Sequence, residues 1–380
     1  MKKRLFCMLL VVCTVLSAMM STTPALAAER SPFTFVPDSK GTGYEVQAYD
    51  TFMAADKTKV EVPATYKGKA VTSIGQGAFA YSTYLETVEL PDSITTIGEG
   101  AFRMCQGLKT INLPKKLKVL GPYAFQNCEV LEKVDLQSGL TTLDTGIFME
   151  CSALKEVTLP KKLSKIGNDA FNRCKSLTEI NIPDTVTSLG DRVFSECTSL
   201  TEIHLPAKLK VIPASAFYEC SALQEITLPK TINKISSQAF SNCKALTEIS
   251  FPKGVTKLED QAFSGCVALA SIKWPSKLTS LGSNCFNSCY ALESIELPSK
   301  VKSIGDACFK SCKNLSMLTL PASVKSLGSN AIKGCRSLTQ VVLLGDIIEV
   351  GDDNCFLDQG SGTYVRKAEE AVKDGNFTRQ

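Results

Sequence analysis

The side chains best placed for chemistry form two columns that repeat every 23 residues. The acidic column consists of Glu156, Glu179, Glu202, Glu225 and Glu248. The second column, two residues further along each repeat, consists of Thr158, Asn181, His204, Thr227 and Ser250. Neighbouring carboxylates can act as general acid and base, or they can attract a basic partner. These ten residues, the acidic strip, are therefore the candidate site.

Catalysis is the weaker of these two uses. A catalytic carboxylate pair needs a pocket that excludes water and separates the two pKa values, whereas a column on an open strand face is solvated. His204 is the single histidine of the chain, and no motif supplies a Ser or Cys nucleophile beside it. We therefore expect no catalytic residues, no enzyme activity and no cofactor.

Cysteines form a column of their own, with eleven in register from Cys105 to Cys335. Such a column favours buried thiols that act as small apolar groups. Neighbouring thiols would lie roughly 5 Å apart, which leaves disulfides open on distance alone. Cys285 and Cys308, one period apart in a different column, are the possible disulfide. Because the cysteines are spread along a column and not gathered in C-x-x-C clusters, we predict no metal site.

These columns reflect a repeat that runs through most of the chain. Prolines recur from Pro91 to Pro321 at intervals of 23 or 46 residues. Phenylalanines recur from Phe79 to Phe309, and leucines from Leu85 to Leu338, without a miss. One unit cannot bury its apolar side chains, but stacked units bury them against one another. The period therefore predicts a repeat solenoid of about twelve coils.

Each unit has a strand half and a turn half. In residues 200–206, apolar Ile203 and Leu205 alternate with polar neighbours, which predicts a short strand that pairs in parallel with the next coil. Leu209 and Ile212 are a second apolar pair that points inward. The apolar spacing from Ala216 to Leu223 predicts a helical or 3₁₀ turn.

The two ends depart from the period, as capping units do. Residues 28–62 are predicted to be an amino-terminal capping hairpin, formed by 44–49 and 59–62. The repeat array spans 63–351, and its first coil carries a five-residue insertion at 66–68. Residues 352–380 are predicted to be a carboxyl-terminal cap, with a strand and a short helix between 363 and 375.

The repeated motif resembles the BspA-like subclass of bacterial leucine-rich repeats. The resemblance rests on segments such as 71–79 (VTSIGQGAF) and 111–114 (INLP), and it covers about residues 40–375. It implies a right-handed leucine-rich-repeat solenoid of the α/β type, located on the bacterial surface or outside the cell and used for adhesion and protein binding. It implies no shared catalytic residues.

The amino terminus predicts export. Residues 2–4 are basic, residues 5–20 are an apolar run, and Ala25-Leu26-Ala27 is a cleavage pattern, so residues 1–27 read as a signal peptide. A retained anchor helix is the alternative. After cleavage following Ala27 the chain keeps 39 Lys and Arg against 38 Asp and Glu. This balance argues against a nucleic-acid partner, and no later stretch predicts a membrane span.

The sequence thus favours a secreted or cell-surface protein that binds a host or bacterial surface protein through its strand face. We expect it to be a monomer. Two alternatives stay open. One is a structural coat or antigenic protein without a specific ligand, and the other is a secreted effector that binds host proteins.

Overall fold

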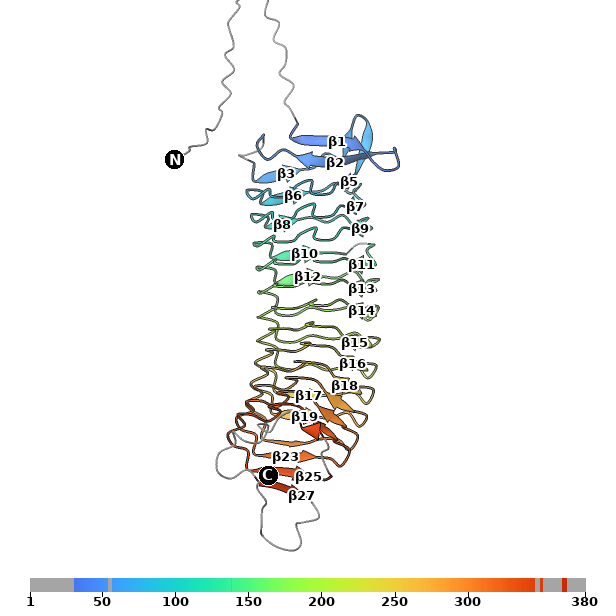
Figure 1. The fold of residues 1–380 in the computed structure, drawn as a ribbon. Helices are drawn as coiled ribbons and strands as arrows, with labels where there is room; N and C mark the ends of the chain where they lie inside the picture. Colours follow the sequence, from blue (N-terminus) through green and yellow to red (C-terminus); the bar gives the residue numbers. More distant parts are fainter. Residues whose placement is uncertain (1–30, 54–56, 138, 346–348, 351–363, 368–380) are drawn as a thin grey trace, which may run out of the picture. The chain divides into compact units, whose positions relative to one another are not determined.

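The computed structural model describes residues 31–53, 57–137, 139–345, 349–350 and 364–367. The predicted signal peptide lies outside the described residues, and so does the carboxyl-terminal cap except for one strand. Residues 32–380 form one unit, in which coils of 23 residues stack on one another (Figure 1). The predicted solenoid is confirmed: strand partners such as Lys133 and Glu156 lie one period apart and pair in parallel.

Strands occupy two sides of the solenoid and form two columns. The first column contains the strands predicted from the Ile and Val positions: β3 (Lys59–Glu61), β6 (Thr87–Glu89), β8 (Thr110–Ile111), β10 (Lys133–Asp135), β12 (Glu156–Thr158), β17 (Glu248–Ser250), β19 (Ser271–Lys273), β21 (Ser294–Glu296), β23 (Met317–Leu320), β25 (Gln340–Leu343) and β27 (Tyr364–Lys367).

The second column was not predicted as strands. It contains β5 (Lys69–Ile74), β7 (Thr96–Ile97), β9 (Val119–Leu120), β11 (Thr142–Leu143), β13 (Lys165–Ile166), β14 (Ser188–Leu189), β15 (Val211–Ile212), β16 (Lys234–Ile235), β18 (Lys257–Leu258), β20 (Ser280–Leu281), β22 (Ser303–Ile304), β24 (Ser326–Leu327) and β26 (Glu349–Val350). Most are two residues long, one exposed and one buried, too short for alternation to be recognised in the sequence.

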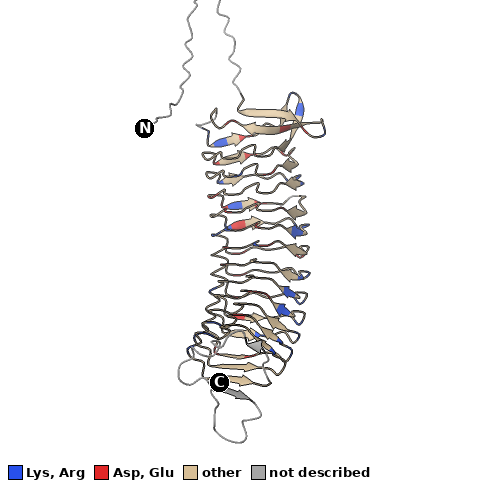
Figure 2. Cartoon of the chain, in the orientation of Figure 1, with Lys and Arg blue, Asp and Glu red and all other residues tan. Residues whose placement is uncertain are grey.

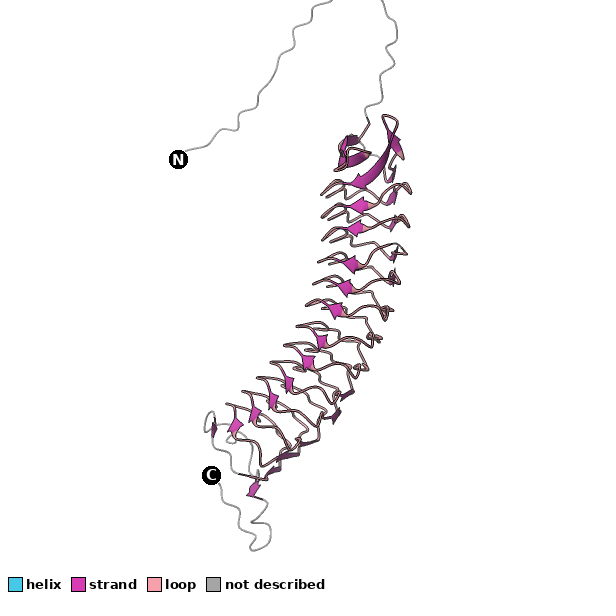
Figure 3. Ribbon diagram, turned by 90° about the vertical axis from the view of Figure 1, so that its right-hand side faces the viewer, coloured by secondary structure: helices cyan, strands magenta, loops and turns pink. Residues whose placement is uncertain are grey.

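The third side of each coil contains turns. The prediction of a helical or 3₁₀ turn on this side was wrong. No helix occurs among the described residues (Figure 3), so none there could span a membrane. Asp169 and Arg173 have φ of 55° and 61°, and a positive φ cannot continue a right-handed helix. The Phe171 and Arg173 amides instead donate to the carbonyls of Val193 and Ser195 in the next coil, at 2.9 and 2.8 Å. The described fold is therefore all-β and not α/β.

Stacked phenylalanines and buried thiols fill the core. Neighbouring rings from Phe79 to Phe309 lie 5.0 to 5.8 Å apart between centroids. Each of the eleven column cysteines donates its thiol hydrogen to a Phe carbonyl of the preceding coil, as Cys197 does to Phe171 at 3.1 Å. Cys285 and Cys308 are free, buried thiols in this structure, and a disulfide between them stays a prediction.

The amino-terminal hairpin is built from different strands than predicted. β1 (Phe33–Pro37) pairs antiparallel with β2 (Tyr44–Tyr49), and β2 pairs in parallel with β5. The predicted partner, β3, instead begins the first column by pairing with β6. The insertion forms a tight hairpin in which β4 (Thr65–Tyr66) returns along β5. Its two turn residues, Lys67 and Gly68, have φ of 49° and 76°, as a two-residue hairpin turn requires.

Close stacking leaves no room for a side chain at a glycine that recurs in several coils, as at Gly98, Gly121, Gly167 and Gly190. A Cβ on Gly121 would lie 2.5 Å from the Glu99 amide nitrogen and 2.6 Å from the Gly98 carbonyl carbon. We expect Gly121→Ala to lower the free energy of unfolding by about 1–3 kcal/mol, because two backbones must separate. Urea titration followed by circular dichroism measures the change.

Gly139→Ala is the matched control for this prediction. A Cβ there would meet its nearest neighbour, the Leu117 carbonyl oxygen, at 3.4 Å, so we expect a change within about 0.5 kcal/mol of wild type. Equal losses in the two variants would contradict the steric argument.

Candidate functional site

The first strand column carries the acidic strip on its solvent side. Glu202 and His204 are exposed, while Ile203 between them is buried. The same alternation holds in the neighbouring coils, because successive strand residues point to opposite faces. The buried Ile or Val of each coil fixes the backbone, and the two flanking polar side chains extend into solvent.

The strip lies along a surface hollow of about 1640 Å³. Eight of the ten predicted residues line it: Glu156, Glu179, Glu202, Glu225, Thr158, Asn181, His204 and Thr227. Glu248 and Ser250, on β17, do not line it. The structure therefore brings together the first four coils of the predicted site and leaves out the fifth.

Strand pairing is interrupted where the hollow lies. β10 pairs with β12 before it and β17 with β19 after it. Between β12 and β17, the described residues of this column form only an isolated bridge, from Asn181 to His204 (Figure 1). Adjacent coils stay in contact through the residue that precedes each Glu, since the Thr201 amide donates to the Thr178 carbonyl at 3.1 Å. The hollow thus coincides with the least regular part of the strand face.

The ion pairing of the charged side chains in this column changes along the array. Near its amino-terminal end, acidic and basic side chains of adjacent coils pair, as in Lys133–Glu156 at 2.7 Å and Lys155–Glu132 at 3.1 Å. Within the part of the chain that the structure describes, none of Glu179, Glu202, Glu225 or Glu248 forms an ion pair. Like charges in adjacent strands repel modestly when solvated. A basic partner would remove this repulsion.

The predicted acidic strip did not include four charged residues that line the same hollow: Lys155, Lys161, Asp184 and Lys230. Lys155 directly precedes Glu156, and the other three directly follow the proline of their coil, so the position after proline is a signal that identifies them. Lysines also occur in the second column, whose strands from β5 to β24 contain no Asp or Glu (Figure 2). Lysines therefore flank the acidic strip chiefly on the side that follows the proline, and this asymmetry would orient a charged partner.

The side chains of the acidic strip are not arranged as a metal site. Over the described ranges, no three His, Cys, Asp or Glu side chains are grouped so that they would hold a metal ion. The carboxylates follow one another in a line along the strip, one per coil, and do not converge on a point. The arrangement suits contact with an extended charged surface.

Comparison with known families agrees with this architecture. The family described as "BspA type Leucine rich repeat region" matches six copies, over residues 72–197, 142–261 and 235–361. Together these ranges cover well over half of the chain. The chain belongs to the BspA type leucine-rich-repeat family. Among curated proteins, the comparison found no match.

Solved structures that are similar to this chain come from several bacteria. A leucine rich cell surface protein from Faecalibacterium prausnitzii is 25% identical, with a TM-score of 0.54 over 87% of this chain and 96% of that one. A leucine-rich repeat protein from Bacteroides ovatus is 26% identical, with a TM-score of 0.51 over 89% and 98%. The pneumococcal vaccine antigen PcpA, at 21% identity and a TM-score of 0.55 over 92% and 90%, shares the fold.

Proposed function

We propose that this BspA type repeat protein is an extracellular or cell-surface binding protein without enzyme activity, and that a protein partner with a basic surface binds in the hollow of the acidic strip. The observation that supports this most is the convergence of eight predicted strip residues on one hollow. Three of its carboxylates, on Glu179, Glu202 and Glu225, have no ion-pair partner among the described residues. The partner belongs to the host or to a bacterial surface or matrix.

Two observations support export of the protein, which the proposal requires. The similar protein from Faecalibacterium prausnitzii is titled a cell surface protein, and residues 1–27 have the pattern of a signal peptide. Cell fractionation and amino-terminal sequencing would check export, with Ala28 as the expected first residue. Retention in the cytoplasm would contradict the proposal.

Charge reversal tests the hollow directly. We expect the triple variant Glu179→Lys, Glu202→Lys, Glu225→Lys to weaken partner binding at least tenfold, because attraction becomes repulsion. Residues 28–380 serve as bait in pull-downs from mucosal and bacterial-surface extracts, and the affinity for a captured protein is then measured at low and high salt.

A control variant with the same change in net charge reverses three exposed carboxylates elsewhere, Glu61, Asp92 and Glu293. We expect it to retain binding. If both triple variants bind like wild type, the hollow is not the site. If wild type captures nothing from any extract, the coat-protein alternative gains support.

A further inference from the structure

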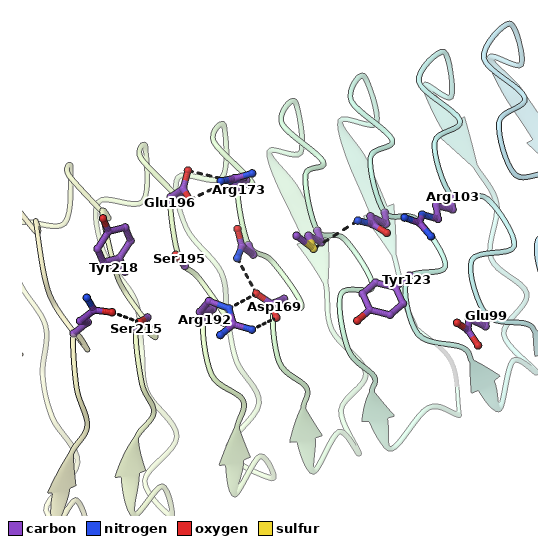
Figure 4. A pocket seen from close by; sticks show the side chains of 14 residues that line it. Glu99, Arg103, Tyr123, Asp169, Arg173, Arg192, Ser195, Glu196, Ser215 and Tyr218 are labelled. Carbon is purple, nitrogen blue, oxygen red and sulfur yellow. Dashed lines mark hydrogen bonds and ion pairs between the residues drawn. The ribbon is translucent and has the colours of Figure 1, made fainter.

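A second hollow, of about 720 Å³, lies on the turn side and shares no residue with the acidic strip. It crosses seven coils, and six of them contribute the residue that follows the core phenylalanine: Arg103, Gln126, Met149, Asn172, Ser195 and Tyr218. Residues with positive φ, such as Asp169, Arg173 and Arg192, stand beside this row (Figure 4). These positions were not predicted as a site, because the turn pattern indicated a structural role alone.

Ion pairs between adjacent coils fix the middle of the hollow. The Arg192 guanidinium donates to both carboxylate oxygens of Asp169 at 2.8 Å. Arg173 lies between two carboxylates and donates to Glu150 at 3.0 Å and to Glu196 at 3.0 Å, the pair drawn in Figure 4. Bidentate guanidinium–carboxylate pairs hold planar groups in one orientation. The walls are therefore organised before any ligand arrives, which lowers the ordering cost of binding.

One buried group in the hollow lacks a partner. Asn172 is 6% exposed, and its Nδ2 donates to Asp169 Oδ1 at 2.8 Å. Its Oδ1 is buried and accepts no hydrogen bond from any described residue. Buried acceptors normally have a donor, so this atom requires a hydrogen that the chain does not supply.

Three further side chains, those of Glu99, Arg103 and Tyr123, lie at the amino-terminal end of the hollow. The Arg103 side chain is exposed and forms no ion pair with any residue the structure describes. The Tyr123 ring lies over Gly146, so closely that a Cβ on Gly146 would be 2.5 Å from Tyr123 Cε1. The missing side chain at Gly146 thus gives the ring a fixed position. A cation and an aromatic face are both available there.

The chemistry of the lining defines the ligand class. Guanidinium, amide, hydroxyl and carboxylate groups offer donors and acceptors side by side, and Met149 is the one aliphatic lining residue. A ligand of many hydroxyl groups, each of which donates and accepts, matches such a surface. The hollow extends over seven coils, which suits a chain of units, and Arg103 is free to pair with a carboxylate. We propose that the turn-side hollow binds an oligosaccharide that contains an acidic sugar.

Calorimetric titration of residues 28–380 tests this proposal. The probes are hexagalacturonate and 3′-sialyllactose, which distinguish uronic from sialic acid, neutral maltohexaose, and a hexaglutamate peptide as a non-sugar anion. We expect at least one acidic saccharide to bind at least tenfold more tightly than the other two probes. Binding of neither acidic saccharide, or equal binding of hexaglutamate, overturns the proposal.

Variants locate the binding within the hollow. We expect Arg103→Ala and Tyr123→Ala each to weaken saccharide binding at least tenfold, with unchanged circular dichroism. Arg336→Ala and Tyr84→Ala remove exposed residues outside the hollow and are expected to bind like wild type. Unchanged binding in the first pair, or equal loss in the second, overturns the assignment. Charge reversal in the acidic strip leaves this binding unchanged, so the two proposals fail independently.

Discussion

Raising the pH from 8 to 10 under reducing conditions is expected to remove most of the stability of the repeat array. In the folded chain burial raises the pKa of ten cysteine thiols, those of Cys105 and Cys266 to about 12. In the unfolded chain they ionise near the ordinary value of 9.0. The unfolded state therefore binds fewer protons above pH 9, and stability falls as pH rises through this range.

The expected loss is large because the thiols act together. Each contributes about 1.4 kcal/mol per pH unit between the two pKa values, so ten thiols contribute on the order of 10 kcal/mol at pH 10. A loss of this size is comparable to the whole stability of an ordinary domain. Urea midpoints measured by circular dichroism from pH 7 to pH 11 would follow it.

The triple variant Cys197→Ala, Cys220→Ala, Cys243→Ala is the control. Its stability at pH 7 is lower, because three thiol–carbonyl hydrogen bonds are lost. Above pH 9, however, the free energy of unfolding of this variant is expected to fall by about 4 kcal/mol less per pH unit than that of wild type. The same pH dependence as wild type would show that the thiols do not cause the alkaline loss.

Phe171→Ala is expected to lower the free energy of unfolding by about 3–5 kcal/mol, which is the second large effect that we predict. The Phe171 ring is fully buried, with ring centroids 5.6 Å from Phe148 and 5.4 Å from Phe194. Removing it leaves a cavity in the middle of a stack in which each coil is stabilised only by its neighbours. Local opening should therefore be centred on this coil, and hydrogen exchange resolved by peptide would detect it.

Phe171→Leu retains most of the side-chain volume and serves as the control. We expect it to cost less than half as much as Phe171→Ala, with little change in the exchange of neighbouring coils. Uniformly faster exchange throughout the array in the Ala variant would indicate that the coils unfold as one unit, and would contradict the nearest-neighbour argument.

The candidate site was predictable in part. A carboxylate every 23 residues on one side of a strand must form a line once coils stack, so the strip follows from sequence alone. That Glu179, Glu202 and Glu225 line a hollow while Glu248 does not depends on where strand pairing is interrupted. Pairing depends on distances between coils, and these distances are set by packing.

The turn-side hollow was also predictable from the sequence only in part. Asp169 with Arg192, and Glu150 with Arg173, are opposite charges one period apart, a signal that was present in the sequence. The sequence did not reveal that these residues face one another, because that requires a positive φ at each position.

The sequence by itself determined the period, the stacked core columns and the acidic strip, since apolar residues recurring every 23 positions have one way to become buried together. Only the tertiary structure decided that the third side is a run of turns without a helix. Amides such as that of Phe171 bond to the next coil, and this bonding holds residues such as Arg173 in a conformation that their own side chains do not favour.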